Sequence, residues 1–197
     1  MNLIKITAVF FLLTTASFAE DWVKILGNPP AIGSVEEMMD LQYLLELQEN
    51  RTEGECEEAR AEESVTLKSL FGGKHGPLSD AEVIENTFMF YKYLVMAGLK
   101  TKQAKKFFKR QRPFARFPNQ IVTCIKESSP NQSYPSGHTS IARVMAYALS
   151  KKYPERRFQF FQKADDSAKY RMIGGVHFPT DIAAGKKLAD YLAKIYF

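Results

Sequence analysis

The chain has 197 residues, of which 45% are hydrophobic and 13% are aromatic, so it is long enough for one domain with a substantial core and is not a disordered chain. Its two cysteines and three histidines exclude a disulfide-dense scaffold and a Cys-only metal site, and the lack of a His-x-x-x-His pair argues against a zinc hydrolase. A net charge of +5 favours anionic partners without choosing among phosphate esters, nucleic acid and a membrane surface.

Residues 1–19 are predicted to be a secretory signal peptide. Lys5 precedes an apolar run, Ile6–Thr15, and Ser17 and Ala19 place small residues at the −3 and −1 positions of a cleavage site. The run is shorter than the roughly 18 residues of a spanning helix, and an uncleaved N-terminal anchor is the alternative. Cleavage near Ala19 would release a periplasmic or secreted domain, residues 20–197.

Export also bears on the two cysteines. In an oxidising compartment, Cys56 and Cys124 allow one intramolecular disulfide. Such a bond would stabilise the fold by roughly 4 kcal/mol in the loop-entropy model. Two free, buried thiols are the alternative.

Capping patterns and apolar periodicity predict helices in the first half of the chain. Residues 34–37, Ser-Val-Glu-Glu, form a capping box that opens a helix. A second capping box at residues 79–82 precedes an apolar-rich run to Leu99. A third helical stretch is predicted over residues 101–112, where Pro113 ends it.

The second half combines an irregular segment with three further predicted helices. Four prolines punctuate residues 113–135. Helical periodicity then extends over about His138–Lys152, Pro154–Met172 and Thr180 to the end. No run alternates with a period of two, so the predicted fold class is all-α: a single-domain, multi-helix bundle with the active site between helices.

A basic cluster over residues 102–116 contains the first candidate ligands for an anion. At about 100° per residue, Lys105 and Arg112 lie within about 20° of each other on a helix, so we expect both beside its apolar stripe, lining a cleft. Arg110 and the neighbouring lysines are expected on the polar side. A solvated basic face or a nucleic-acid-binding patch is the alternative.

The segment Ser133–Thr139 is typical of a tight turn at the start of a helix. Pro135 and Gly137 permit close backbone approach, free N–H groups at a helix N-terminus bind anions, and the Ser136 hydroxyl adds a donor. His138 would act on the same ligand. An ordinary Ser-Gly turn with a capping histidine is the alternative.

The third cluster consists of Arg171, His177 and Asp181. Gly174 and Gly175 indicate that a helix ends before His177, so the chain can fold back. Because His177 and Asp181 are four residues apart, the carboxylate can accept from one imidazole nitrogen and leave the other with its lone pair outward. A surface His–Asp pair is the alternative.

Together the three clusters resemble the signature of the type 2 phosphatidic acid phosphatase and vanadium haloperoxidase superfamily. Lys105–Phe114, Ser133–Ser140 and Arg171–Asp181 look most like the corresponding blocks of the secreted bacterial class A non-specific acid phosphatases. Residues 28–31 and the predicted helix over 40–52 are similar to the N-terminal segment of that family. The resemblance covers nearly the whole chain after the predicted signal peptide.

The resemblance implies a role for each residue. The family histidine matching His177 attacks phosphorus to form a phosphohistidine, the aspartate matching Asp181 orients it, and the histidine matching His138 protonates the leaving alkoxide. The groups that hold the phosphoryl oxygens match Lys105, Arg112, Ser136, Gly137 and Arg171. Because one lysine and two arginines would supply the counter-charge, no metal and no cofactor is required.

The chain departs from the family pattern at one position in the third cluster. Tyr170 stands where the family usually has a serine before the arginine, and a bulkier phenol would lose a short hydrogen bond behind the phosphate site. The resemblance also allows a homo-oligomer, although relatives often continue further beyond the position of Asp181.

We therefore predict a periplasmic, metal-independent acid phosphatase that acts on small phosphorylated substrates, with no nucleic acid as a partner. A lipid-phosphate phosphatase in peripheral contact with a membrane, a vanadate-dependent peroxidase and a degenerate phosphate-binding relative are the alternatives. A nucleic-acid-binding module would explain residues 102–116 but not the Ser-Gly-His turn or the His177–Asp181 pair.

Overall fold

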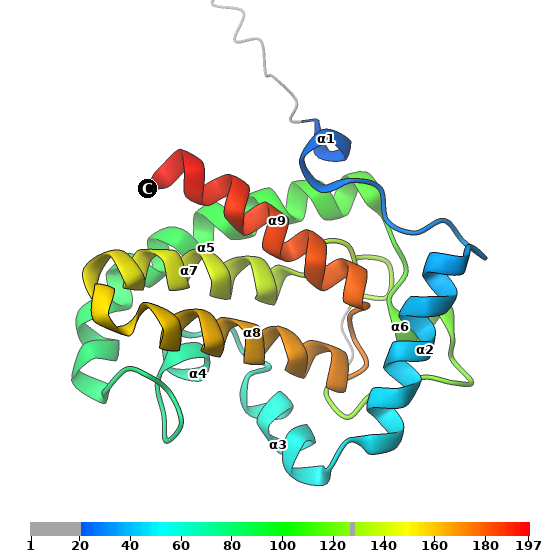
Figure 1. Cartoon of the computed structure of the whole chain (residues 1–197), viewed down its shortest axis with the longest axis horizontal. Coiled ribbons are helices and arrows are strands. Elements are labelled where there is room, and N and C mark those ends of the chain that lie inside the picture. Colours follow the sequence, from blue (N-terminus) through cyan, green and yellow to red (C-terminus); the bar gives the residue numbers. More distant parts are fainter. Residues whose placement is uncertain (1–20, 127–128) are drawn as a thin grey trace, which may run out of the picture.

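The computed structural model describes residues 21–126 and 129–197, and within these ranges the chain forms helices and no strand (Figure 1). This confirms the predicted all-α class. The predicted signal peptide lies outside the described residues. In chain order the helices are α1 (Trp22–Leu26), α2 (Val35–Asn50), α3 (Glu53–Ala61), α4 (Leu67–Phe71), α5 (Asp80–Phe108), α6 (Pro113–Arg116), α7 (Gly137–Lys152), the 3-10 turn η1 (Pro154–Arg156), α8 (Arg157–Ile173) and α9 (Pro179–Tyr196).

Helix α7 lies at the centre of the bundle and packs against α5, α8 and α9. Its side chains Met145 and Leu149 are fully buried, as are Phe160 from α8 and Leu188 from α9. Each large apolar side chain buried in this way contributes roughly 1.5–3 kcal/mol to folding. The helices that carry the three clusters are therefore held together by a single apolar core.

The predicted helix starts are found close to their predicted positions. The Ser79 hydroxyl accepts from the backbone N–H of Glu82, and the Glu82 carboxylate accepts from the Ser79 N–H at 2.9 Å, which completes the capping box of α5. At α2, Ser34 caps the helix, but the Glu37 carboxylate accepts from the Gly33 N–H at 2.6 Å instead.

The prediction of a separate helix over residues 101–112 is wrong. Helix α5 runs unbroken from Asp80 to Phe108 because its buried face continues through Ala97, Thr101 and Ala104. It ends where Lys109 takes a left-handed conformation, with φ of 51°. Although α5 is the longest described helix, neither it nor any other in the described ranges has the length and apolar content to cross a membrane.

Arg112 is consequently not on the helix that carries Lys105. It lies in extended conformation directly before α6, with Pro113 as the first helical residue. This is the conformation that a residue preceding proline favours, since the proline ring disfavours the helical region. The argument that placed Lys105 and Arg112 on one helix face is therefore wrong, although both side chains are buried.

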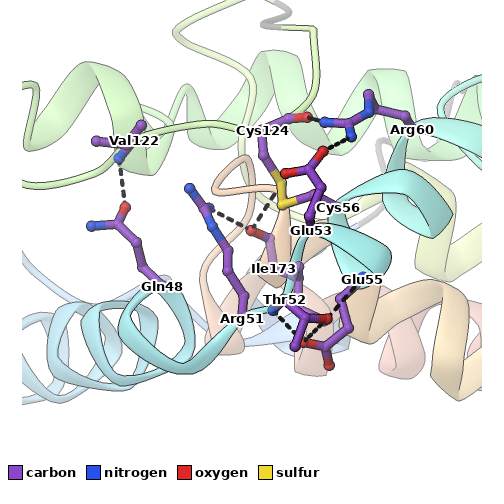
Figure 2. Close-up of a disulfide and its surroundings, with 10 residues drawn as sticks. All are labelled: Gln48, Arg51, Thr52, Glu53, Glu55, Cys56, Arg60, Val122, Cys124 and Ile173. Atoms are coloured by element: carbon purple, nitrogen blue, oxygen red, sulfur yellow. Dashed lines mark hydrogen bonds and ion pairs between the residues drawn. A yellow bond between two sulfur atoms is a disulfide. The ribbon is translucent and has the colours of Figure 1, made fainter.

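Helices α2 and α3 are tied to the loop between α6 and α7 and to the end of α8 (Figure 2). Cys56 of α3 forms a disulfide with Cys124, so the structure has the bonded alternative for the two cysteines. Arg60 donates to the Cys124 carbonyl at 3.0 Å, and Arg51 donates to the Ile173 carbonyl at 2.9 Å. The N-terminal helices thus brace the end of α8, where the chain turns toward His177.

Candidate active site

The structure brings His177 and Asp181 into contact at the start of α9. Asp181 is the third residue of this helix, and its Oδ2 lies 3.3 Å from His177 Nδ1. The same oxygen accepts from the Phe178 N–H at 2.9 Å and from the Ser133 hydroxyl. Both side chains are buried. This network assigns the Nδ1–H tautomer to His177, which leaves the lone pair on Nε2.

Electrostatics keep this pair in the neutral-imidazole, ionised-carboxylate state. Burial and the nearby Arg112 guanidinium lower the pKa of His177 well below its usual value. Burial opposes the charge on Asp181, but the hydrogen bond with His177 and the Arg110 guanidinium outweigh it and hold the pKa of the carboxyl low. His177 Nε2 is therefore an unprotonated nitrogen in a strongly cationic environment.

Arg112 reaches this nitrogen from the loop before α6. Its Nη1 lies 3.2 Å from His177 Nε2 and 2.8 Å from the Val176 carbonyl, while its Nε donates to the Ser129 carbonyl at 3.0 Å. The backbone N–H of Arg112 donates to the Pro130 carbonyl at 2.7 Å. These contacts hold a buried guanidinium against the imidazole without any shared helix.

Lys105 enters the same region from the last turns of α5. Its ammonium group donates to the Gln132 carbonyl and to the Ser133 carbonyl at 3.2 Å. Burial, with a further contribution from Arg112, lowers the pKa of Lys105 to about 7. A bound anion would favour the charged form of this amine.

Among the buried cations Lys105, Arg112 and Arg171, Arg171 is the one whose side chain has donors without a hydrogen-bond partner in the described part of the chain. Its side chain, on the last turn of α8, is 4% exposed, and its Nε and Nη1 have no hydrogen-bond partner among the described residues. Burial and the neighbouring Arg112 lower the pKa of Arg171 to about 10. Because unpaired buried donors are costly, this guanidinium is suited to a ligand with several acceptor oxygens.

The Ser-Gly-His turn starts α7 beside these groups. Ser136 is the N-cap; its hydroxyl accepts from Thr139 Oγ1 at 2.9 Å, and its N–H donates to the Asp181 carbonyl at 3.0 Å. A Cβ added to Gly137 would lie 3.4 Å from the Thr101 methyl group and 3.9 Å from Lys105 Cε. The turn therefore packs directly on α5 and α9, at the end of the bundle that carries Lys105 and Asp181.

His138 is held in place by the segment that follows α3. Its Nε2 lies 3.2 Å from the Glu62 carbonyl and 3.1 Å from the Glu63 carbonyl, so this nitrogen carries the proton. The Glu62 carboxylate is itself buried and pairs with Lys163 at 2.6 Å. Burial and Arg171 lower the pKa of His138 to about 3. His138 is thus neutral in the absence of an anion.

Tyr170, which stands where the family usually has a serine, lies in an apolar environment. It is half-buried and belongs to an apolar cluster with Ala59, Ile125 and Val176, next to the disulfide of Cys124. The Tyr170 ring therefore packs against α3, at a position where the family usually has a small serine side chain.

Sequence reasoning missed Arg110 and Asp40. Arg110 was expected on a polar face, but its side chain is 8% exposed and lies between two carboxylates, Asp40 and Asp181. Its spacing from Arg112 carried no signal, because a two-residue spacing has a defined direction only within a helix or strand, and Arg110 lies between α5 and α6. The chain turns at Lys109, and this turn brings Arg110 inside.

Comparisons with known proteins show which family this chain resembles. Residues 87–197 match the PAP2 superfamily. A non-specific acid phosphatase of Providencia stuartii is 30% identical over 184 residues, which cover 88% of this chain and 73% of that protein. A non-specific acid phosphatase of Salmonella typhimurium is 36% identical over 103 residues, which cover 50% of this chain and 40% of that protein.

A solved structure shares the fold. The crystal structure of a transmembrane PAP2-type phosphatidylglycerolphosphate phosphatase from Bacillus subtilis superposes with a TM-score of 0.58 at 18% identity, covering 89% of this chain and 91% of that chain. The family match spans more than half of this chain, and the Providencia relative is matched over most of its length. This chain belongs to the PAP2 superfamily.

Proposed function

We propose that this chain is a metal-independent acid phosphatase that hydrolyses phosphomonoesters through a phosphohistidine on His177. The observation that carries the proposal is the buried, neutral His177 with its Nε2 lone pair facing Arg112, beside the unsatisfied donors of Arg171. The named relatives, which are acid phosphatases, support the same class of reaction.

The cluster of cations matches the charge that phosphoryl transfer must stabilise. Uncatalysed monoester hydrolysis is so slow that enzymes accelerate it by up to about 10²¹-fold. The three equatorial oxygens carry the charge in the transition state, and preorganised cations are the main means of stabilising it. Lys105, Arg112 and Arg171, all buried, would supply this counter-charge.

Substrate binding would shift the Arg112 contact from His177 Nε2 to a phosphoryl oxygen. In the structure Arg112 Nη1 lies 3.2 Å from His177 Nε2. A phosphoryl group placed there would accept this donor and those of Arg171, which frees the Nε2 lone pair. His177 Nε2 would then attack phosphorus while the P–O ester bond breaks, and Asp181 would stabilise the imidazolium that forms.

His138 would supply and recover the proton. It would give a proton to the leaving alkoxide and then take one from the water that attacks the phosphohistidine, releasing phosphate and restoring neutral His177. The pKa of His138 is lowered to about 3, first by burial and then by Arg171, and a bound dianion would favour the protonated form by offsetting the Arg171 charge. We therefore propose that phosphate binding promotes proton uptake by His138.

We propose a periplasmic or secreted location. The predicted signal peptide and the Cys56–Cys124 disulfide support it, because disulfides persist in oxidising compartments. Fractionation of cells that produce the full chain, with N-terminal sequencing of the product, tests this. Retention in the cytoplasm with residues 1–19 intact would contradict it.

The functional test compares two histidine variants. His177→Ala should lose at least about 10³-fold in kcat on nitrophenyl phosphate, because the nucleophile is gone. His75→Ala is the matched control, since His75 is exposed in the loop between α4 and α5, and it should retain wild-type kcat. Turnover by His177→Ala close to that of His75→Ala would refute the assignment.

A substrate panel separates soluble from lipid substrates. Nucleotide, sugar and inositol phosphates are compared with phosphatidic acid in vesicles, using residues 20–197. We expect higher kcat/KM for the soluble esters. Turnover confined to the vesicles would replace the proposal with the lipid-phosphate alternative.

A further inference from the structure

Behind the His177–Asp181 pair, two further buried charges continue the network. Arg110 Nη1 donates to Asp181 Oδ1 at 2.7 Å, and Arg110 Nη2 donates to Asp40 Oδ2 at 2.9 Å. The guanidinium lies over the Phe178 ring, with Cζ 4.2 Å from the ring centroid. The side chains of Asp40, Arg110 and Asp181 are 3%, 8% and 0% exposed, so the series is shielded from water.

Asp40 connects this series to an N-terminal helix and to the first turn of α9. It lies on α2, outside the span of residues 87–197 that matches the family. Its Oδ1 accepts from the Thr180 N–H at 3.1 Å, and its Oδ2 accepts from the Thr180 hydroxyl, which also accepts from Arg110 at 2.7 Å. Helix α2 therefore fixes the backbone next to Asp181 as well as its charge partner.

We propose that Arg110 and Asp40 are positioning residues for the nucleophile. They hold the Asp181 carboxylate in the orientation that His177 requires and share its negative charge, although neither touches the proposed phosphate site. The inference rests on the proposed function, and it makes the N-terminal helix part of the catalytic arrangement.

The alternation of charge gives the two residues opposite electrostatic effects. When Asp40 is neutralised, Arg110 attracts the Asp181 carboxylate more strongly, and this carboxylate then stabilises a protonated His177 less. Without Arg110, the whole Asp181 charge acts on His177. Lys105 of α5, Arg112 of the loop and Asp181 of α9 act directly on the His177 imidazole. Arg110 acts on Asp181, and both His138 of α7 and Arg171 of α8 interact with Arg112.

The test uses isosteric variants of the series. We expect Asp40→Asn to lower kcat at least about 10-fold with KM within about 3-fold, as loss of an outer partner does elsewhere. We expect the acid limb of kcat/KM to move to lower pH in Asp40→Asn and to higher pH in Arg110→Met. Arg110→Lys should restore part of kcat and return the limb toward wild type.

Glu37→Gln is the matched control. Glu37 lies on the same helix, is equally buried and pairs with Arg116 at 3.0 Å, without contact with Asp181. Glu37 acts mainly on Arg116 and more weakly on Arg110. Glu37→Gln therefore reports the cost of loosening α2, and its acid limb should move much less than that of Asp40→Asn. Shifts of the acid limb in one common direction in Asp40→Asn, Arg110→Met and Glu37→Gln, or no shift in Asp40→Asn, would overturn the positioning role.

A spectroscopic readout separates this inference from the proposed function. With ¹⁵N-labelled histidine, only three imidazoles contribute, and His75→Ala and His138→Ala assign them. Wild type should show the Nδ1–H tautomer at His177, and Arg110→Met and Asp40→Asn should shift its Nε2 resonance in opposite directions. If wild type hydrolyses no phosphoester, the proposed function fails, and these resonances still decide the positioning role.

An independent observation concerns the outer face of α5. Five large apolar side chains on it are solvent-exposed, and at about 100° per residue they lie within an arc of about 80°. They are Ile84 (76% exposed), Phe88 (85%), Tyr91 (55%), Val95 (56%) and Leu99 (58%). The opposite face carries the buried residues, so α5 is apolar on both sides, which is typical of a helix covered on both sides.

We infer that a second copy of this chain covers the stripe of residues 84–99, with the two α5 helices antiparallel. Asp80, which pairs with Lys68 of the same chain at 3.3 Å, precedes the stripe, and Lys102 and Lys106 follow it on the same face. A two-fold axis near Tyr91 and Lys92 would place Asp80 of each copy beside the lysines of the other. The stripe is roughly 22 Å long, at 1.5 Å per residue.

Sedimentation of residues 20–197 tests this interface. Wild type should be a dimer at micromolar concentration, and Phe88→Glu and Val95→Glu should be monomers with a wild-type helical spectrum. Phe158→Glu, at a site on α8 that is 79% exposed, is the control and should remain a dimer. Lys102→Glu should weaken the dimer, and Asp80→Lys in the same chain should restore it. A wild-type monomer, whether or not it binds anionic vesicles, would overturn the inference.

Discussion

His177 and Asp181 illustrate what a short spacing determines at the scale of single residues. Four positions apart across the start of α9, they meet at 3.3 Å, as their sequence spacing predicted. The spacing could not predict the partner on the other nitrogen, because Arg112 arrives from a loop 65 residues earlier in the chain. A local pair is readable from sequence, whereas its electrostatic environment is a tertiary property.

The buried imidazole predicts how stability depends on pH. The pKa of His177 is lowered in the fold by burial and then by Arg112, so the unfolded chain binds a proton that the folded chain does not. Stability is therefore full above the unfolded pKa of about 6.5 and falls as the pH drops from 7 to 5. Urea unfolding at both pH values measures this, with His177→Ala as the control that should lose this part of the dependence. An equal dependence in the variant would contradict it.

The proposed acid role of His138 predicts a dependence on the leaving group. His138→Ala should reduce kcat by about 10²-fold or more for alkyl phosphates, whose alkoxides need a proton, and far less for nitrophenyl phosphate. Steady-state kinetics on the two ester classes measure the ratio. Equal losses on both classes would show that His138 acts by another route.

At the scale of elements, close approach between α7 and α9 depends on a glycine that the sequence did not single out. A Cβ at Gly185 would lie 2.7 Å from the Ser136 carbonyl and 2.9 Å from Thr139 Cβ, too close for the two backbones to remain in place. Gly185 therefore sets the distance between the helix that carries Asp181 and the turn that carries His138.

This contact gives a prediction with an internal control. Gly185→Ala should force α9 away from α7, lowering both kcat and the thermal midpoint. Gly98→Ala, in α5 where an added Cβ meets nothing within 4 Å, should instead stabilise the helix by roughly 0.5–1 kcal/mol and leave kcat unchanged. Thermal melts and kinetics on both variants decide it, and an unchanged kcat in Gly185→Ala would count against this packing role.

The elements were predictable where local signals dominate. The capping box at Ser79 and the prolines predicted helix starts, and Gly174 and Gly175 correctly predicted the end of α8. The end of α5 was not predictable, because its apolar inner face gave no sign of where the helix stops and Lys109 adopts a conformation rare for lysine. Arg110 was missed for the same reason.

At the scale of the whole molecule, the chain combines the PAP2 domain with an N-terminal layer. The resemblance predicted from three short clusters is confirmed by the family match and by the acid phosphatase relatives. Helices α2 and α3 lie before the matched residues, yet they reach the site through Asp40, Arg51 and the carbonyl of Glu62. Their contribution was not predictable, because it depends on contacts between residues 70 or more positions apart.

The most direct test of the central claim is where the phosphoryl group resides during turnover. Wild-type protein mixed with substrate is denatured within milliseconds at alkaline pH, where phosphohistidine persists, and the peptides are mapped by mass spectrometry and ³¹P NMR. We predict one phosphoryl group, on Nε2 of His177. A phosphoryl group on any other residue, or turnover with no phosphorylated peptide when phosphoenzyme breakdown is slowed, would contradict the account.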